Sequence, residues 1–302
     1  MAETLQGILP VLPTPFDADG GIDLPAMPRL VRFALDAGVH GVVFPGFASE
    51  VEHLTADERL ALLKSVVDAV GGAVPIVAGA SGPDVESVVE HGRAAAELGI
   101  PWLMIQPPKS IGSEAAEVVR FMTEVADGLT DSRFVLQNAP APRGSDLSAA
   151  TLRELAAAVP QIAYIKEETL PSGPSISALL DEPPVSLRGV IGGGGARYIL
   201  DEYQRGACAV MPALELADEH VALDRAWRSG DRATARSIYV RTLPLLVLQA
   251  VYRMRLTKHT LVRRGVLEHT TVRAPTPEMD AAAVADVDAN LAELGLVPAA
   301  PA

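Results

Sequence analysis

Cysteine is nearly absent from this chain, in which Cys208 is the single example among 302 residues. One cysteine cannot form an internal disulfide or a cysteine-based metal cluster. Cys208 stands in the apolar stretch 207–211, which predicts a small buried core residue rather than a nucleophile. The six histidines show no spacing typical of metal ligands, so we expect no metal site and no cofactor.

Positive charge and long apolar runs are also scarce. The 25 Lys and Arg residues stand against 38 Asp and Glu residues, which gives a net charge of −13. Nucleic-acid binding depends on clustered basic residues, so this composition argues against a nucleic-acid partner. No run approaches the roughly 18 to 20 apolar residues of a membrane span, and residues 1–4 lack the basic and then apolar order of a signal peptide. We therefore expect a cytoplasmic protein with no membrane partner.

Apolar, strand-like runs alternate with amphipathic stretches from about residue 7 to residue 230, which is typical of a parallel sheet covered by helices. Eight βα units in a segment of this length fit a closed (β/α)8 TIM barrel better than an open sheet. The expected strands begin near Ile8, Val42, Ile76, Leu103, Val135, Ala163, Gly189 and Ala207.

Capping residues indicate where several helices begin. Thr55 and Glu58 form a capping box, Asp84 precedes a helix that ends at Gly99, and Ser148 precedes one that runs to Val159. Another helix is expected from Asp23 to Ala37. Three helical stretches follow the last strand, at residues 232–249, 252–264 and 281–294. We predict a catalytic barrel over residues 1–230, C-terminal helices over 231–296 and a disordered tail over 297–302.

Lys166 lies at the C-terminal end of a short apolar strand, IAYIKEE (residues 162–168). The chain has only three other lysines, Lys64, Lys109 and Lys258, and all three stand in stretches that indicate solvated helix or loop. An ammonium among apolar residues has a lowered pKa, and the free amine can attack a carbonyl. Lys166 is therefore a candidate Schiff-base residue; the alternative is a strand-end lysine that extends to water.

The loops that follow the strands carry the other candidates, because barrel active sites lie there. The backbone amides around Gly46 and the Ser49 hydroxyl could hold a carboxylate, although an ordinary turn is equally compatible. Gln137 ends the fifth strand facing inward, and Arg143 could meet an anionic group or lie in water. Four glycines, residues 192–195, precede a helix expected from Ala196 and could offer Gly193 and Gly194 amides to an anion. This loop has neither the lysine of a Walker motif nor the position of a Rossmann fingerprint.

Several of these segments in this order resemble the dihydrodipicolinate synthase and N-acetylneuraminate lyase family. The segments are GILPVLPTPF (7–16), GFASE (46–50), IKE (165–167), the glycine loop and Gly206-Ala207. The resemblance implies a (β/α)8 barrel with extra C-terminal helices, a homotetramer or homodimer, and a lyase whose strand-six lysine forms an imine with a small 2-keto acid. Lys166 matches that lysine. Ala48 and Ser49 fall in the keto-acid carboxylate loop, and Gly193 and Met211 fall at pocket-lining positions.

This chain departs from the family pattern in three places. Phe47 replaces the hydroxyl residue that relays protons, Gln137 replaces the strand-five tyrosine, and the segment after strand four contains no tyrosine. An amide cannot act as a general acid or base, which argues against the synthase reaction. The sequence looks more similar to the branch that dehydrates 2-keto-3-deoxy sugar acids, the L-2-keto-3-deoxyarabonate dehydratases. That likeness lies in QNAP (137–140), KEET (166–169), LTK (256–258) and RAP (273–275).

The expected chemistry is an imine between Lys166 and C2 of a 2-keto acid, followed by dehydration or by aldol cleavage. The proton could move to Glu168, to a water held by Ser49 and Gln137, or to the substrate carboxylate. Gln137 and Arg143 would orient hydroxyls or a distal carboxylate. Three different functions remain open: condensation with pyruvate by a 4-hydroxy-tetrahydrodipicolinate synthase, a keto-acid-binding barrel without turnover, and a phosphate-binding barrel.

Overall fold

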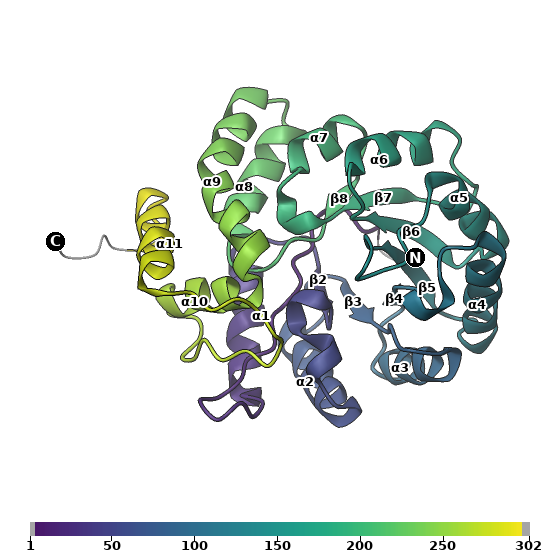
Figure 1. Cartoon of the computed structure of the whole chain (residues 1–302), viewed down its shortest axis with the longest axis horizontal. Coiled ribbons are helices and arrows are strands. Elements are labelled where there is room, and N and C mark those ends of the chain that lie inside the picture. The colour runs from purple at the N-terminus through teal and green to yellow at the C-terminus, as the bar shows by residue number, and fades with distance from the viewer. Residues whose placement is uncertain (1–3, 298–302) are drawn as a thin grey trace. The chain divides into compact units, whose positions relative to one another are not determined.

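The computed structural model describes residues 4–297, in which strands and helices alternate in the order of a (β/α)8 barrel (Figure 1). The fold class predicted from the sequence pattern is therefore confirmed, and extra helices follow the last βα unit. The strands are β1 (Gly7–Ile8), β2 (Val42–Phe44), β3 (Ile76–Gly79), β4 (Trp102–Ile105), β5 (Arg133–Asn138), β6 (Ile162–Glu167), β7 (Gly189–Gly192) and β8 (Ala209–Val210).

Eight α-helices follow the strands, and three more complete the described chain. Those of the βα units are α1 (Met27–Asp36), α2 (Ala56–Val70), α3 (Val85–Glu97), α4 (Ala115–Gly128), α5 (Ala149–Ala158), α6 (Ser172–Asp181), α7 (Ile199–Gln204) and α8 (Ala217–Arg228). The C-terminal ones are α9 (Arg232–Tyr252), α10 (Met254–Arg263) and α11 (Ala281–Glu293). Short 3-10 turns are η1 (Leu24–Ala26), η2 (Phe47–Ser49), η3 (Val51–His53), η4 (Lys109–Ile111) and η5 (Gly194–Ala196).

The predicted caps are present. Thr55 and Glu58 exchange backbone-to-side-chain hydrogen bonds at 3.0 and 3.2 Å. The side chains of Asp84 and Ser148 each accept a hydrogen bond from the backbone N–H of the residue three positions later. The helix expected from Ala196 is wrong, because α7 begins at Ile199. Gly195 and Ala196 both have left-handed φ angles, 66° and 63°, and this geometry interrupts a right-handed helix.

Contacts divide the described chain into two compact units. Unit 1 comprises residues 4–6, Pro75–Gly194 and Tyr198–Met211, and unit 2 comprises Gly7–Val74, Gly195–Arg197 and residues 212–297. Unit 1 therefore carries β3 to β8 with α3 to α7, and unit 2 carries β1, β2, α1, α2 and α8 to α11. The boundary at residue 230, between the catalytic barrel and the C-terminal helices, divides the chain by function and stays a prediction.

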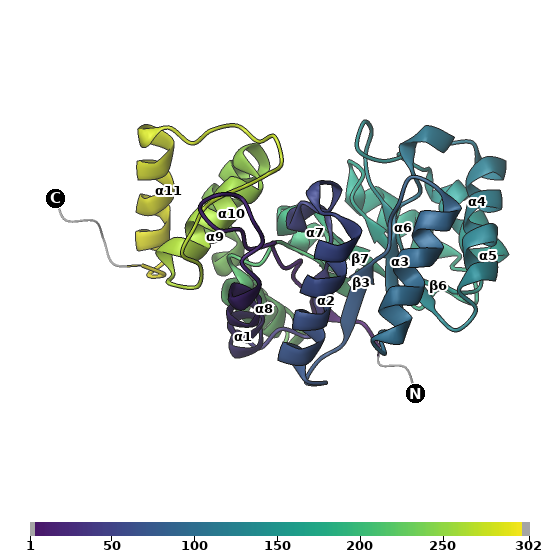
Figure 2. The ribbon, with the colours of Figure 1, turned by 90° about the horizontal axis from the view of Figure 1, so that it is seen from below.

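Within unit 1 the six strands pair in parallel, in chain order from β3 to β8. Helices α3 to α6 ring the outside of this sheet (Figures 1 and 2). The register pairs Gln137 with Lys166 and Lys166 with Ile191, so these three side chains leave the sheet on one face at one level. Asn138 and Glu167 are the next pair along and point to the opposite face.

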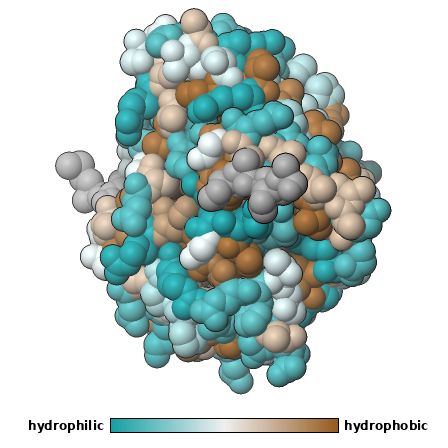
Figure 3. Space-filling view, turned by 90° about the vertical axis from the view of Figure 1, so that its left-hand side faces the viewer, coloured by the Kyte–Doolittle hydropathy of each residue, from teal (hydrophilic) through white to brown (hydrophobic). Residues whose placement is uncertain are grey.

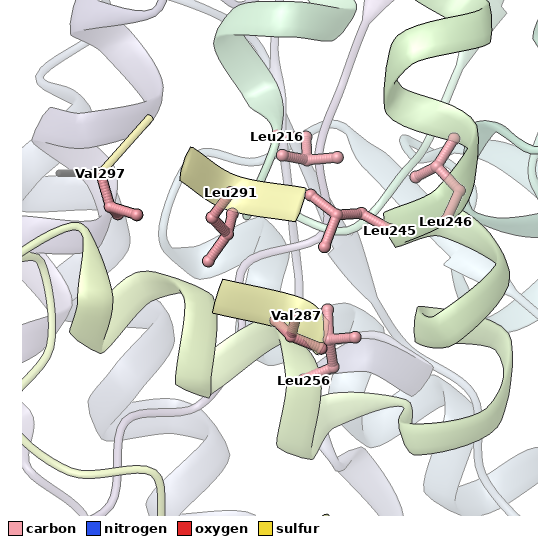
Figure 4. Close-up of a cluster of buried hydrophobic side chains, with 7 residues drawn as sticks. All are labelled: Leu216, Leu245, Leu246, Leu256, Val287, Leu291 and Val297. Carbon is pink, nitrogen blue, oxygen red and sulfur yellow. The ribbon is translucent and has the colours of Figure 1, made fainter. Parts of the chain in front are cut away.

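In unit 2 the C-terminal helices pack on one another in both ribbon views (Figures 1 and 2). A buried apolar cluster joins them (Figure 4): Leu216, Leu245, Leu246, Leu256, Val287, Leu291 and Val297. Val297, the first residue of the expected tail, is buried here, and residues 298–302 lie outside the described residues. Hydrophilic and apolar residues are interspersed on the surface of this side of the molecule (Figure 3).

Three further observations concern sequence expectations. Cys208 is half-buried rather than fully buried, and its thiol donates to the Val190 carbonyl at 3.3 Å. Lys64 and Lys109 are exposed as expected, whereas the expectation for Lys258 is wrong, because its side chain is completely buried. Between residues 4 and 297, no helix is both long enough and apolar enough to cross a membrane.

Candidate active site

Lys166 is the second-to-last residue of β6 and is only 4% exposed. The preceding residues of the strand, Ile162 to Ile165, are apolar or aromatic and fully buried, which is why the segment forms a central strand. Tyr164, two residues earlier on the same face, packs edge-on against Trp102 with ring centroids 5.4 Å apart. The lysine thus emerges from an apolar layer at the C-terminal end of the sheet.

Glu168 lies beside Lys166, with 3.3 Å between Oε2 and Nζ. The same Oε2 accepts a hydrogen bond from the Gln137 amide at 2.5 Å and lies 3.5 Å from Arg143 Nη2. Its other oxygen, Oε1, accepts from the Gly194 N–H at 3.3 Å. The Glu168 side chain is 8% exposed, so it is a buried acid and not a solvated loop residue.

The glycine loop makes room for this carboxylate. A Cβ added at Gly193 would overlap Glu168 Cγ, so a larger residue there would displace the acid. The next residue, Gly194, has a φ of 55° and directs its N–H at Glu168 Oε1. The loop therefore donates a hydrogen bond to the protein's own carboxylate. Binding of a substrate anion by Gly193 and Gly194 stays a prediction.

The charges of the cluster act on one another. Burial lowers the pKa of Lys166, the negative charge of Glu168 opposes that shift, and the charge of Arg143 adds to it. Burial alone would raise the pKa of Glu168, but Lys166, Arg143 and the hydrogen bonds from Gln137 and Gly194 outweigh it and lower that pKa to about 2. Glu168 is therefore ionised at neutral pH, and the amine that it faces is easier to deprotonate than an exposed lysine.

A second polar network, behind the first, holds the ends of β5 and β6. Glu167 accepts the amide and hydroxyl of Thr169 with one oxygen, and the amide of Asn138 and the hydroxyl of Ser175 with the other. Asn138 also exchanges two hydrogen bonds with the backbone of Leu147, at 2.9 Å each. Asn138 therefore fixes both ends of the loop that carries Arg143. Sequence reasoning missed Asn138 and Glu167, although their alternation with Gln137 and Lys166 is the pattern of a strand polar on both faces.

Glu202 of α7 lies against the same part of the sheet and was also missed. Its Oε1 accepts from the Ser172 hydroxyl at 3.0 Å, and a Cβ at Gly192 would overlap its Oε2. Burial raises the pKa of Glu202 to about 8, with the Ser172 hydrogen bond acting in the opposite direction. Glu202 is thus an uncharged carboxylic acid at neutral pH. Met211, predicted to line the pocket, directly follows β8, is buried, and donates its N–H to the Gly192 carbonyl at 3.0 Å.

Ala48 and Ser49 lie in unit 2, within η2. The Ser49 hydroxyl donates to the Leu12 carbonyl at 2.5 Å, and the Ser49 N–H donates to the Gly46 carbonyl at 2.9 Å. Both donors of Ser49 are therefore engaged in holding the turn. The Ala48 amide belongs to the first turn of η2, where N–H groups have no acceptor within the helix. It is the better candidate of the two for a carboxylate.

The turn that carries Ala48 ends in a buried ion pair that sequence reasoning missed. Glu50 has a left-handed φ of 59°, and its Oε1 lies 2.6 Å from Lys258 Nζ with both side chains fully buried. Its Oε2 accepts the backbone amides of Arg273 and Ala274 at 2.6 and 2.7 Å. Burial lowers the pKa of Lys258 to about 8, against the charge of Glu50. The two segments singled out by resemblance, residues 256–258 and 273–275, thus converge on Glu50.

The described residues contain no group of three or more His, Cys, Asp and Glu side chains that could hold a metal ion. The side chains of unit 1 offer chemistry of their own. A buried amine with a lowered pKa can attack a carbonyl, an adjacent carboxylate can accept a proton, and an amide and a guanidinium can orient hydroxyls.

Similar proteins match nearly the whole chain. The model of the Dihydrodipicolinate synthetase family matches residues 4–294. The chain is 30% identical over 278 residues to L-2-keto-3-deoxyarabonate dehydratase of Azospirillum brasilense, covering 91% of this chain and 89% of the relative. It is 36% identical over 179 residues to 4-hydroxy-tetrahydrodipicolinate synthase of Stenotrophomonas maltophilia, covering 59% of each chain.

Among solved structures, YagE of E. coli K12 superposes with a TM-score of 0.87 over 97% of this chain and 100% of that one, at 24% identity. It is a prophage protein of the dihydrodipicolinic acid synthase family, solved in complex with pyruvate. At this identity the likeness shows the fold alone, and it agrees with the element order described above.

Proposed function

This chain belongs to the dihydrodipicolinate synthetase family and is a lyase, and from that premise we propose that it dehydrates a 2-keto-3-deoxy sugar acid through an imine on Lys166. The observation that carries the proposal is the buried pair of Lys166 and Glu168, 3.3 Å apart, with Gln137 where the family resemblance leads one to expect tyrosine. The pair supplies a nucleophile and a proton acceptor without a phenol.

The first stage is imine formation. The neutral amine of Lys166 attacks C2 of the keto acid, and the C2 oxygen leaves as water with one proton from Nζ and one from solvent, so that a positively charged iminium joins Nζ to C2. Burial favours the neutral amine that this step requires.

The second stage is elimination. Glu168 removes a proton from C3, and the electron pair of that C–H bond moves toward the iminium to form an enamine. The enamine then forms a double bond between C3 and C4 as the C4 hydroxyl leaves as water, with the proton that Glu168 carries. The low pKa of Glu168 makes it a weak base in the resting site. A substrate hydroxyl that takes over the Gln137 amide removes one of the donors that depress this pKa, and the carboxylate becomes a stronger base.

Dehydration is preferred over aldol condensation because of Gln137, which cannot relay protons as a phenol can. The relatives support both reactions, since one named as a dehydratase is 30% identical over 91% of this chain and one named as a synthase is 29% identical over 98% of it. Condensation with pyruvate, as in 4-hydroxy-tetrahydrodipicolinate synthase, is the second candidate, supported by the 36% identity of the shorter match.

A phosphate-binding barrel and a keto-acid-binding barrel without turnover have less support. Phosphate would bind at the glycine loop, but Glu168 already occupies the Gly194 amide. A protein that only binds keto acids has no chemical use for a lysine buried beside a carboxylate. The carboxylate loop at Ala48 and Ser49, a cytoplasmic location and a homotetramer or homodimer stay predictions drawn from the sequence.

Imine formation is tested by borohydride reduction in the presence of pyruvate or a 2-keto-3-deoxy sugar acid, followed by intact mass measurement and peptide mapping. We expect one covalent adduct on Lys166, no adduct in Lys166→Ala, and an unchanged adduct in Lys64→Ala, which alters an exposed lysine. Labelling of Lys64 or Lys109 with Lys166 unmodified would overturn the proposal.

The reaction type is tested on the sugar acid that labels Lys166 best. Dehydration gives one product that keeps all the carbon atoms of the substrate, whereas aldol cleavage gives pyruvate and an aldehyde. Detection of pyruvate as a stoichiometric product by mass spectrometry would replace the dehydratase with an aldolase.

A further inference from the structure

The charges that surround Lys166 do more than support the chemistry. We propose that Glu168 makes the site selective for 2-keto acids whose far end, beyond C3, is uncharged, and that a second carboxylate at that end is rejected. This inference rests on the proposed imine, and it decides between two roles left open for Arg143 and Gln137, the orientation of hydroxyls or the binding of a distal carboxylate.

Few charged groups surround Lys166 within unit 1. Two cationic groups, Lys166 and Arg143, converge on one ionised acid, Glu168. Glu202 lies nearby but is held as a neutral acid by burial, which raises its pKa to about 8. Glu167 points to the opposite face of β6, where four hydrogen bonds hold it.

Imine formation leaves these charges balanced for one class of substrate. The iminium on Lys166 and the guanidinium of Arg143 are two positive charges, and Glu168 and the substrate's own C1 carboxylate are two negative ones. A neutral distal chain keeps the sum at zero. A distal carboxylate adds a third negative charge, which finds no further cation among these residues, and an uncompensated charge in a buried site is strongly disfavoured.

The hydrogen-bond geometry favours the same class. Glu168 Oε2 already accepts from Gln137 at 2.5 Å and lies 3.3 Å from Lys166 and 3.5 Å from Arg143, so the donors that a distal carboxylate would need are directed at the protein's own carboxylate. A hydroxyl can join this arrangement, because it donates to Glu168 and accepts from Gln137 or Arg143 at the same time. The position is built for the acid, since Gly193 leaves it space and Gly194 donates to it.

The test compares two keto acids of equal chain length, 2-oxopentanoate, with a neutral end, and 2-oxoglutarate, with a carboxylate at C5. Borohydride trapping rates are measured at subsaturating concentration, and the ratio of the two rates is taken within each variant, so that a general loss of imine formation cancels. In the wild type we expect the neutral acid to be trapped faster by about tenfold or more, since each tenfold corresponds to about 1.4 kcal/mol.

Two substitutions should move this ratio in opposite directions. Glu168→Gln removes the negative charge and keeps the shape, and the ratio should fall by about tenfold or reverse. Arg143→Met removes a positive charge, and the ratio should rise. A wild type that traps both acids equally, or a ratio unchanged in Glu168→Gln, overturns the inference.

Folding of each variant is checked by circular dichroism. If Glu168→Gln does not fold, Arg143→Met decides alone, with a rising ratio in support and an unchanged or falling one against. A wild type that traps neither of these acids nor pyruvate contradicts the imine itself, which distinguishes failure of the proposed function from failure of the selectivity.

Discussion

At the scale of single residues, Gly193 determines whether Glu168 can lie beside Lys166. A Cβ at this position overlaps Glu168 Cγ, whereas a Cβ at the adjacent Gly192 overlaps Glu202 instead. The two glycines therefore offer a matched pair of substitutions that displace one acid or the other.

We predict that Gly193→Ala shifts the pH dependence of imine trapping to lower pH. Glu168 raises the pKa of Lys166, so its displacement lets the amine lose its proton at lower pH. Borohydride trapping of pyruvate across the pH range measures the shift. Gly192→Ala, which displaces Glu202, is the comparison and should shift the profile less, because the charge of Glu202 contributes less than that of Glu168 to the pKa of Lys166; a Gly193→Ala profile identical to wild type would show that Glu168 does not act on Lys166.

The residues that sequence reasoning found and missed differ in one physical respect. The ends of two adjacent strands carry Lys166, Gln137 and Glu168. Alternate residues of a strand point to the same face, so the sequence alone predicts that these side chains lie together. The roles of Gly193 and Asn138 depend instead on which atoms of other segments lie within a few ångströms, and no local pattern encodes such distances. Lys258 was expected to be solvated, because a lysine on a helix usually is.

At the scale of elements, the caps of α2, α3 and α5 were predictable because each involves residues only three positions apart. The link between η2 and α10 was not, because Glu50 and Lys258 are 208 positions apart. Buried ion pairs between distant elements arise from tertiary packing, and removal of one partner leaves a charge without compensation.

We predict that Lys258→Met lowers the free energy of unfolding by about 3 to 5 kcal/mol, since Glu50 stays buried as an unpaired carboxylate. The double variant Glu50→Gln, Lys258→Met should lose less than the sum of the two single variants, because it removes both charges together. Urea denaturation measures all three. Lys64→Met, on the exposed side of α2, is the control, and a loss of the same size there would contradict the special role of the pair.

At the scale of the whole molecule, buried titratable groups make stability depend on pH in opposite directions. Burial raises the pKa of Glu202 to about 8 and that of Glu215 to about 7, so their contributions are complete below the ordinary value of 4.5 and are lost as the pH rises through the raised ones. Burial lowers the pKa of His220 to about 4, so its contribution is complete above 6.5 and is lost as the pH falls through 4.

We predict that Glu202→Gln stabilises the protein more at pH 8 than at pH 5. The amide cannot ionise, so the variant avoids a cost that the wild type meets as the unfolded carboxylate loses its proton above pH 4.5; the difference should grow by up to about 4 kcal/mol. Glu215 and His220 cancel in the comparison of variant with wild type. Urea denaturation at both pH values measures it, with Glu182→Gln, an exposed acid, as the control. A difference that does not change with pH would mean that Glu202 is ionised in the native protein.

The hydrogen bonds that Glu50 accepts from Arg273 and Ala274 also determine when folding can be completed during translation. The amides that hold the turn carrying Ala48 belong to residues 223 and 224 positions after Glu50. A ribosome must therefore translate and release residues 273 and 274 before this turn can reach its final conformation. Until then, the nascent chain contains β6 with Lys166 but lacks the fixed conformation of the Ala48 turn, which the family resemblance places in the loop that binds the keto-acid carboxylate.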